Sequence, residues 1–64
     1  MKVRDILKVL DADGWYEARR RGSHRVLKHD AKPGIVVVPG HLSDEVAPGT
    51  LKSIRDQAAL EGKL

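Results

Sequence analysis

The chain has 64 residues, a formal net charge of +3 and no cysteine. This length suits one compact domain over residues 1–64 and excludes a second. Without cysteine there is neither a disulfide framework nor a thiolate metal site, so a reducing cytosol is the expected setting. No apolar run is long enough for a signal peptide or a membrane span, and we therefore expect a cytoplasmic protein without a membrane partner.

The first element expected is an amphipathic helix over residues 2–11. Its apolar residues recur at the i, i+3, i+4, i+7 spacing of a helix. They are Val3, Ile6, Leu7 and Leu10. Asp13-Gly14 supplies the stop and the turn that follow the helix. Trp15 comes next and is expected to anchor the core between helix and strand, because the chain has no phenylalanine.

A β-hairpin is expected after the helix. Residues 15–20 have the pattern of a strand, and residues 24–29 have the pattern of its antiparallel partner. The pair Gly22-Ser23 between them is typical of a two-residue turn. The sequence therefore places this turn at the tip of the hairpin.

The rest of the chain completes a two-layer fold. A second turn at residues 30–34 leads to the β-branched run at residues 35–38, which predicts a third strand packed on at least one side. A polar loop at residues 41–47 precedes Pro48, whose fixed φ suits the first position of a helix. The apolar stripe of that helix is Leu51, Ile54 and Ala58. The order αβββα predicts an α+β fold with a three-stranded antiparallel sheet and both helices on one face.

Positive charge is concentrated in the predicted hairpin. No acidic residue lies between Glu17 and Asp30. The basic residues in that interval are Arg19, Arg20, Arg21, Arg25 and Lys28. Such a field attracts polyanions, of which RNA is the commonest, with an anionic membrane or an acidic protein as competitors. A solvated charged hairpin without a partner is the alternative interpretation.

The chemically distinctive segment is Arg-Arg-Gly-Ser-His-Arg at residues 20–25. It places His24 beside a small turn and among guanidinium groups. Histidine has an ordinary pKa of about 6.5, which suits proton transfer near neutral pH. Arginines can bind phosphate oxygens with two hydrogen bonds and stabilise the charge that develops at phosphorus. The candidate RNA contacts are Ser23, Arg20, Arg21, Arg25 and Lys28.

Strand periodicity sorts these side chains between the two faces of the sheet. If the strand alternates strictly, Lys28 shares the face of His24, whereas Arg25 and His29 point to the other face. Lys28 is then the better phosphate contact. His24 and His29 cannot hold one metal ion together, and the aspartates do not cluster, so a metallonuclease is disfavoured and no cofactor is expected. We expect His41, in a loop, to cap local backbone, and the alternative is a second proton-transfer group or an RNA contact.

Four blocks of sequence carry a family resemblance. They are Asp13-Gly14-Trp15 after the first helix, Gly22-Ser23-His24-Arg25 in the hairpin, Val38-Pro39 with His41 shortly after, and Pro48-Gly49-Thr50-Leu51 at the start of the last helix. Together they resemble the HicA toxin family, over nearly the whole chain and in the same order. One departure is the acidic pair Asp44-Glu45, where relatives often carry lysine. This pair argues against RNA contact by that loop.

The resemblance implies a double-stranded-RNA-binding-domain-like fold and a cytoplasmic toxin that cleaves mRNA. It also implies neutralisation by a HicB-type antitoxin, which we expect to bind over the basic hairpin. The catalytic histidine of the family corresponds to His24, for which we expect a role as general acid or base without metal. Arg25 or Lys28 would bind phosphate, and Ser23 would position it.

Two other functions remain open from the residues alone. The first is a double-stranded-RNA-binding module without catalysis, which needs a basic patch at the start of the last helix. Only Lys52 and Arg55 supply charge there. The second is a protein-interaction domain whose basic hairpin docks on an acidic partner.

Overall fold

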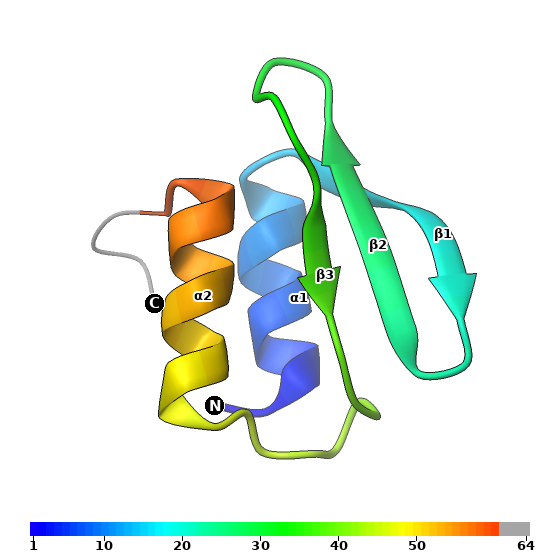
Figure 1. The fold of residues 1–64 in the computed structure, drawn as a ribbon, viewed down its shortest axis with the longest axis vertical. Helices are drawn as coiled ribbons and strands as arrows, with labels where there is room; N and C mark the ends of the chain where they lie inside the picture. Colours follow the sequence, from blue (N-terminus) through cyan, green and yellow to red (C-terminus); the bar gives the residue numbers. More distant parts are fainter. Residues whose placement is uncertain (61–64) are drawn as a thin grey trace.

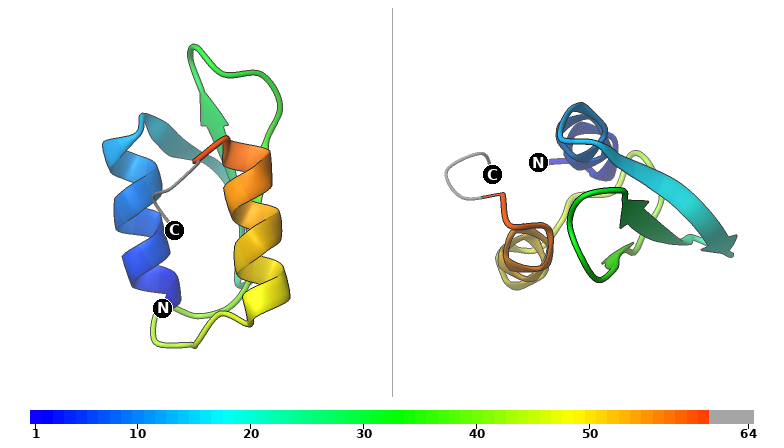
Figure 2. Two further views of the ribbon diagram at one scale, coloured as in Figure 1. Left: turned by 90° about the vertical axis from the view of Figure 1, so that its left-hand side faces the viewer. Right: turned by 90° about the horizontal axis from the view of Figure 1, so that it is seen from above.

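The computed structural model describes residues 1–60 and has the expected order αβββα (Figure 1). The elements are α1 (Val3–Ala12), β1 (Trp15–Arg21), β2 (His24–His29), β3 (Val36–Val38) and α2 (Pro48–Ala58). The strands are antiparallel in the order β1-β2-β3. Both helices cover the same face of this sheet (Figure 2). The predicted two-layer α+β fold is confirmed.

Where the observed boundary of an element differs from the predicted one, the difference is one residue. Both ends of α1 lie one residue later than expected, and β1 continues to Arg21. Ile35 lies outside β3, because the pairing of β3 with β2 begins at Val36 opposite Leu27. Gly22 and Ser23 form the hairpin turn, as predicted.

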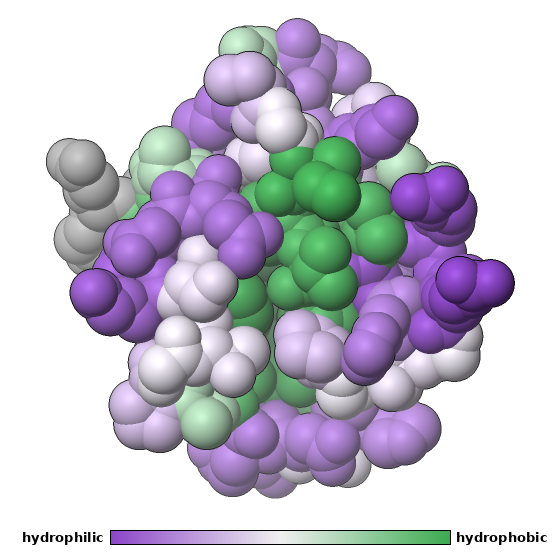
Figure 3. Space-filling view, viewed as in Figure 1, coloured by the Kyte–Doolittle hydropathy of each residue, from purple (hydrophilic) through white to green (hydrophobic). Residues whose placement is uncertain are grey.

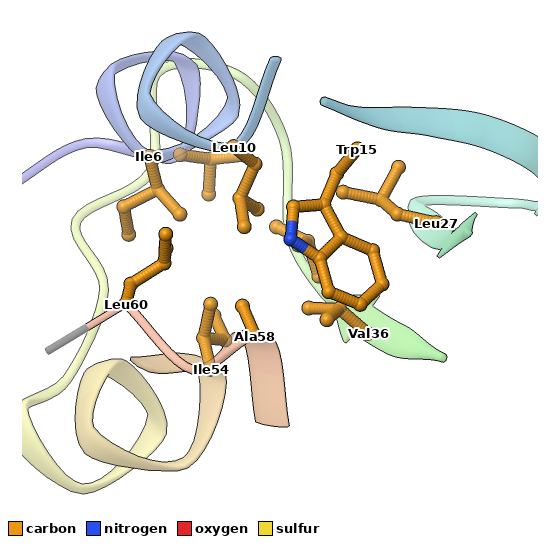
Figure 4. Packing of buried hydrophobic residues seen from close by; sticks show 10 residues of the cluster. Ile6, Leu10, Trp15, Leu27, Val36, Ile54, Ala58 and Leu60 are labelled. Atoms are coloured by element: carbon orange, nitrogen blue, oxygen red, sulfur yellow. The ribbon is translucent and has the colours of Figure 1, made fainter. Parts of the chain in front are cut away.

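The core lies between the two helices and the inner face of the sheet (Figure 4). The helices contribute the predicted stripes, with Leu7 and Leu51 at their margins. Trp15 is buried at the junction of α1 and β1, and its Nε1 donates a hydrogen bond to the Asp13 carboxylate at 3.2 Å. The core residues are Val3, Ile6, Leu10, Trp15, Leu27, Val36, Val38, Ile54, Ala58 and Leu60. Leu60, which the helical pattern did not include, is buried beyond the end of α2.

His29 is a structural residue on the inner side of the sheet. Its Nε2 donates to the Asp13 carbonyl at 2.6 Å, because its Nδ1 accepts hydrogen bonds from the amides of Ala31 and Lys32 at 2.9 and 3.0 Å. Gly14 has φ +103°, and a Cβ there would lie 2.7 Å from His29 Nε2. The turn after α1 therefore needs glycine for its backbone angle and for the space that His29 occupies.

Lys32 joins the β2–β3 connection to the ends of both helices. Its Nζ lies 2.6 Å from Asp13 Oδ2, just after α1, and 3.1 Å from the carbonyl oxygen of Ala58, at the end of α2. The C-terminal ends of the two helices lie at the end of the sheet where this connection runs (Figure 1). A cation there also interacts favourably with the carbonyl groups left free at the end of a helix.

Candidate nucleic-acid interface

A β-bulge in β1 decides which arginines face solvent on the open side of the sheet. Glu17 is opposite Leu27, but Arg19, two residues later, is opposite the next residue of β2, Val26, so Ala18 is an extra residue. Such an insertion changes which residues of a strand share a face. Glu17 therefore lies on the inner face, whereas Arg19 and Arg21 lie on the outer face, which no helix covers.

Strand β2 keeps the predicted alternation. Arg25 and Leu27 are buried on the inner face, whereas His24 and Lys28 are exposed on the outer face. The side chains of His24 and Lys28 thus share a face, as the period of two predicted. The turn before β2 places Arg21 directly opposite His24. Gly22 there has φ +59°, the sign required at the first central position of the tight turns that suit hairpins.

His24 borders a shallow depression of about 510 Å³ on the outer face. Its lining residues are Arg19, Arg20, Arg21, His24, Val26 and Val37. A smaller depression next to it, of about 170 Å³, is also lined by Arg19 and Val26, and it adds Lys28. No acidic side chain lines either depression. The outer face therefore presents an exposed histidine beside several cations, with no carboxylate in the lining of either depression.

The cations of the outer face are not used to hold the fold together. Within residues 1–60, no ion pair engages the side chains of Arg19, Arg21 or Lys28. The ring of His24 likewise has no hydrogen-bond partner in this part of the chain. These groups are thus available to an anionic ligand, and arginine in particular matches the oxygens of a phosphate.

Arg25 lies on the opposite side of the sheet and is 7% exposed. Its Nη1 donates to the carbonyl oxygen of Gly40 at 2.9 Å and, less closely, to that of Ser23 at 3.5 Å. Its Nε lies 3.5 Å from Glu17 Oε1. The structure therefore does not bring Arg25 to the face of His24, and its guanidinium instead connects three segments of the chain.

Arg20 and Ser23 also differ in position from the other predicted contacts. Arg20 lies opposite Arg25, and its Nη2 is 3.1 Å from Glu17 Oε1. Its long side chain still reaches the rim of the depression at His24. Ser23, in the turn, is half-buried. The predicted contacts did not include Arg19, because the bulge that puts Arg19 beside Val26 leaves no mark in the hydrophobic pattern. They did not include Val26 or Val37, because these side chains carry no charge.

Other potential functional groups lie away from this depression. His41 is exposed in the loop before α2 and does not line it; its backbone amide donates to the Asp44 carboxylate at 2.9 Å. No group of three side chains suited to hold a metal ion occurs among residues 1–60. Over the same residues, neither helix is long and apolar enough to cross a membrane.

The arrangement suits a phosphodiester better than a small neutral ligand. An open, shallow surface with three cations and one proton-transfer group fits an extended anionic chain. The chain matches, over residues 3–60, a family model described as the HicA toxin of bacterial toxin-antitoxin. No curated protein matches it.

Proposed function

The chain belongs to the HicA toxin family of bacterial toxin–antitoxin systems, and from this membership we propose that it is an endoribonuclease that cleaves mRNA without a metal ion. His24 is the general acid or base of the reaction. The observation that carries the proposal is the exposure of His24 on the same sheet face as Arg19, Arg21 and Lys28. The match and the geometry support the proposal independently.

The proposed reaction uses the 2′-hydroxyl of RNA as the nucleophile. His24 removes the proton of this hydroxyl, the 2′-oxygen bonds to phosphorus, and the bond from phosphorus to the 5′-oxygen breaks. The departing 5′-oxygen takes a proton from the imidazolium of His24 or from water. The products are a 2′,3′-cyclic phosphate and a 5′-hydroxyl, so DNA, which lacks the nucleophile, is not cut.

The other residues of the site fall into two groups under this proposal. Arg19, Arg21 and Lys28 bind the phosphate and stabilise the charge that develops on its oxygens. Ser23, in the turn beside His24, positions the phosphate. Arg25 supports this turn from the other face of the sheet, where its Nη1 donates to the carbonyl oxygen of Ser23. Arg20 is held by Glu17 and reaches the RNA only from the rim.

Membership of a toxin–antitoxin family implies an antitoxin partner for this chain. We propose that this partner is of the HicB type and binds over the hairpin of β1 and β2, where it shields His24. Complementary charge would speed their association and make it sensitive to salt. Toxin and antitoxin would act in the cytoplasm, where mRNA is accessible.

Incubation of the protein with end-labelled mRNA tests the proposal, with His24→Ala as the decisive variant. A general acid or base contributes about 10²- to 10⁴-fold in rate, so cleavage by His24→Ala should fall by that factor while the fold remains. His41→Ala is the matched control, because within residues 1–60 His41 makes hydrogen bonds through its backbone and not through its ring. Its cleavage rate should stay within about twofold of the parent.

Four other results would contradict the proposal. Undiminished cleavage by a folded His24→Ala protein would exclude the catalytic assignment. Loss of cleavage in EDTA, restored by a divalent cation, would show metal chemistry. RNA retained but uncut by the unmodified protein would indicate a double-stranded-RNA-binding module, and neither binding nor cleavage would indicate a protein-interaction domain.

A further inference from the structure

An aliphatic strip runs along the open face of the sheet, next to the depression at His24. It consists of Val26 of β2, Val37 of β3 and Ile35 just before β3, and we call it the outer strip. Ile35 is 46% exposed and Val37 is 36% exposed. Figure 3 shows this apolar area over β3 and its surroundings, with strongly hydrophilic residues on the side where β1 lies.

The outer strip is unsuited to RNA. Its side chains offer no hydrogen bonds and no aromatic ring on which a base can stack, whereas RNA recognition depends on phosphate contacts, stacking and hydrogen bonds. An exposed apolar area with a polar rim is instead typical of a protein–protein interface. The chemistry of the strip thus favours a protein over a nucleic acid.

The charged side chains around the outer strip restrict the kind of protein that can bind there. Arg19, which lines both depressions, and Lys28 flank Val26 and Ile35 without a carboxylate in either lining. A partner needs apolar side chains for the centre and carboxylates for the rim. The antitoxin that the family implies is a protein that must recognise this chain, and the strip adjoins the residue that it has to cover.

We propose that the outer strip is the apolar anchor of the antitoxin. This inference rests on the proposed function, because it places the inhibitor on the face of His24. Antitoxin and RNA would share the cations of this face and the depression that Val26 and Val37 line, but only the antitoxin would use Ile35. Antitoxin affinity and RNA cleavage are therefore separable by substitution of Ile35.

The key variant is Ile35→Ser, because Ile35 is the residue of the strip that does not line the depression at His24. Loss of a buried isoleucine side chain from an interface should raise the Kd for the antitoxin by about 10- to 100-fold. The probe is the protein encoded beside this chain, and the Kd is measured by calorimetry. Val37→Ser, as a second variant, should raise the Kd similarly.

Leu42→Ser is the matched control. Leu42 is 50% exposed, but it lies beside Leu7 and Trp15 in a groove on the other side of the sheet. Its substitution should leave the Kd for the antitoxin within about twofold of the parent. Each variant is checked for an unchanged circular-dichroism spectrum and cooperative melting, so that a loss of binding is not a loss of fold.

The calorimetry uses the His24→Ala background, so its result does not depend on catalysis and remains decisive if the protein cuts no RNA. With His24 restored, Ile35→Ser should cleave mRNA within about twofold of the parent rate and resist neutralisation. An unchanged Kd for both Ile35→Ser and Val37→Ser would overturn the proposal. A cleavage rate of Ile35→Ser that falls by the same factor as its antitoxin affinity would also overturn the proposal, because it would show that Ile35 contacts RNA.

Discussion

Among residues 1–60, Arg25 is the only buried charged residue, and its surroundings explain why burial is tolerated. A buried charge is unfavourable unless it is paired and hydrogen-bonded. Arg25 meets this condition through the carbonyl of Gly40, 15 residues later in the chain, and through the Glu17 carboxylate. At the scale of a single residue, a guanidinium adjacent to the proposed catalytic histidine thus serves the fold, whereas the exposed Lys28 remains free for a ligand.

Substitution of these two cations by glutamine should separate stability from RNA binding. Arg25→Gln should lower the free energy of unfolding by about 1–3 kcal/mol, because it leaves the Gly40 carbonyl without its charged donor and the Glu17 carboxylate with Arg20 as its remaining partner. Lys28→Gln should change the free energy of unfolding by less than about 0.5 kcal/mol. It should lower the affinity for RNA to the same extent whatever the RNA sequence. Urea denaturation measures the first effect, and RNA affinity at several salt concentrations measures the second.

The salt dependence provides the sharper criterion. Each phosphate contact that is lost makes the slope of log K, the RNA association constant, against log salt concentration shallower by about one. Lys28→Gln should show this reduced slope. If Arg25→Gln showed it as well and kept the parent's urea midpoint, Arg25 would be a phosphate contact, and its burial in the free chain would not describe the RNA complex.

At the scale of the elements, a polar link at one end of the sheet joins the helix layer to the sheet layer. The helices contact the sheet through apolar side chains, whereas Lys32 adds a polar link between the β2–β3 connection, the end of α1 and the end of α2. The two charged groups of this link are partly buried, with Lys32 and Asp13 side chains 31% and 14% exposed. Removing one partner from such a pair is more destabilising than removing one from an ion pair in open solvent, because the remaining charge stays partly buried.

Lys32→Gln should therefore destabilise the protein more than substitution of an ordinary surface lysine. We expect a loss of about 1–2 kcal/mol, since the Asp13 carboxylate and the Ala58 carbonyl lose a charged donor. In a chain of this size about 1 kcal/mol shifts the melting temperature by about 4–8 °C. Lys8→Gln, on the exposed side of α1, is the control and should melt with the parent. Equal melting temperatures for Lys32→Gln and Lys8→Gln would show that the link contributes nothing to stability.

At the scale of the whole molecule, small size makes stability dependent on the partner. A domain of about 60 residues buries only about 60% of the surface that its unfolded chain exposes, which leaves a narrow margin of stability. A ligand that binds only the folded state adds to this margin by mass action. An antitoxin would thus stabilise the toxin that it inhibits.

Titration with the antitoxin should raise the melting temperature as its concentration increases. At 100 times the Kd the added stability is about 2.7 kcal/mol. Association should be fast at low salt and slower at high salt, as stopped-flow measurements can determine. Hydrogen exchange on the complex then locates the contact. Protection of the helices without protection of residues 19–28 would mean that the antitoxin acts by distortion and leaves the hairpin open.

The sequence by itself determined the features that depend on neighbours along the chain. The spacing of apolar residues defines α1 and the stripe of α2, and the Gly22-Ser23 pair defines the hairpin turn. Alternation within β2 places Lys28 on the face of His24. These patterns are local because helix and strand periods come from the backbone, and the element order αβββα follows from them.

Only the tertiary structure decided which charges reach the face of His24. The bulge at Ala18 moves Arg19 and Arg21 outward, and it depends on pairing with β2. Burial of Arg25 depends on the Gly40 carbonyl, which belongs to a distant segment. Exposure of Ile35 and Val37 follows from the position of both helices on the other face. Contacts between residues far apart in the chain set these features, and no period within one segment encodes them.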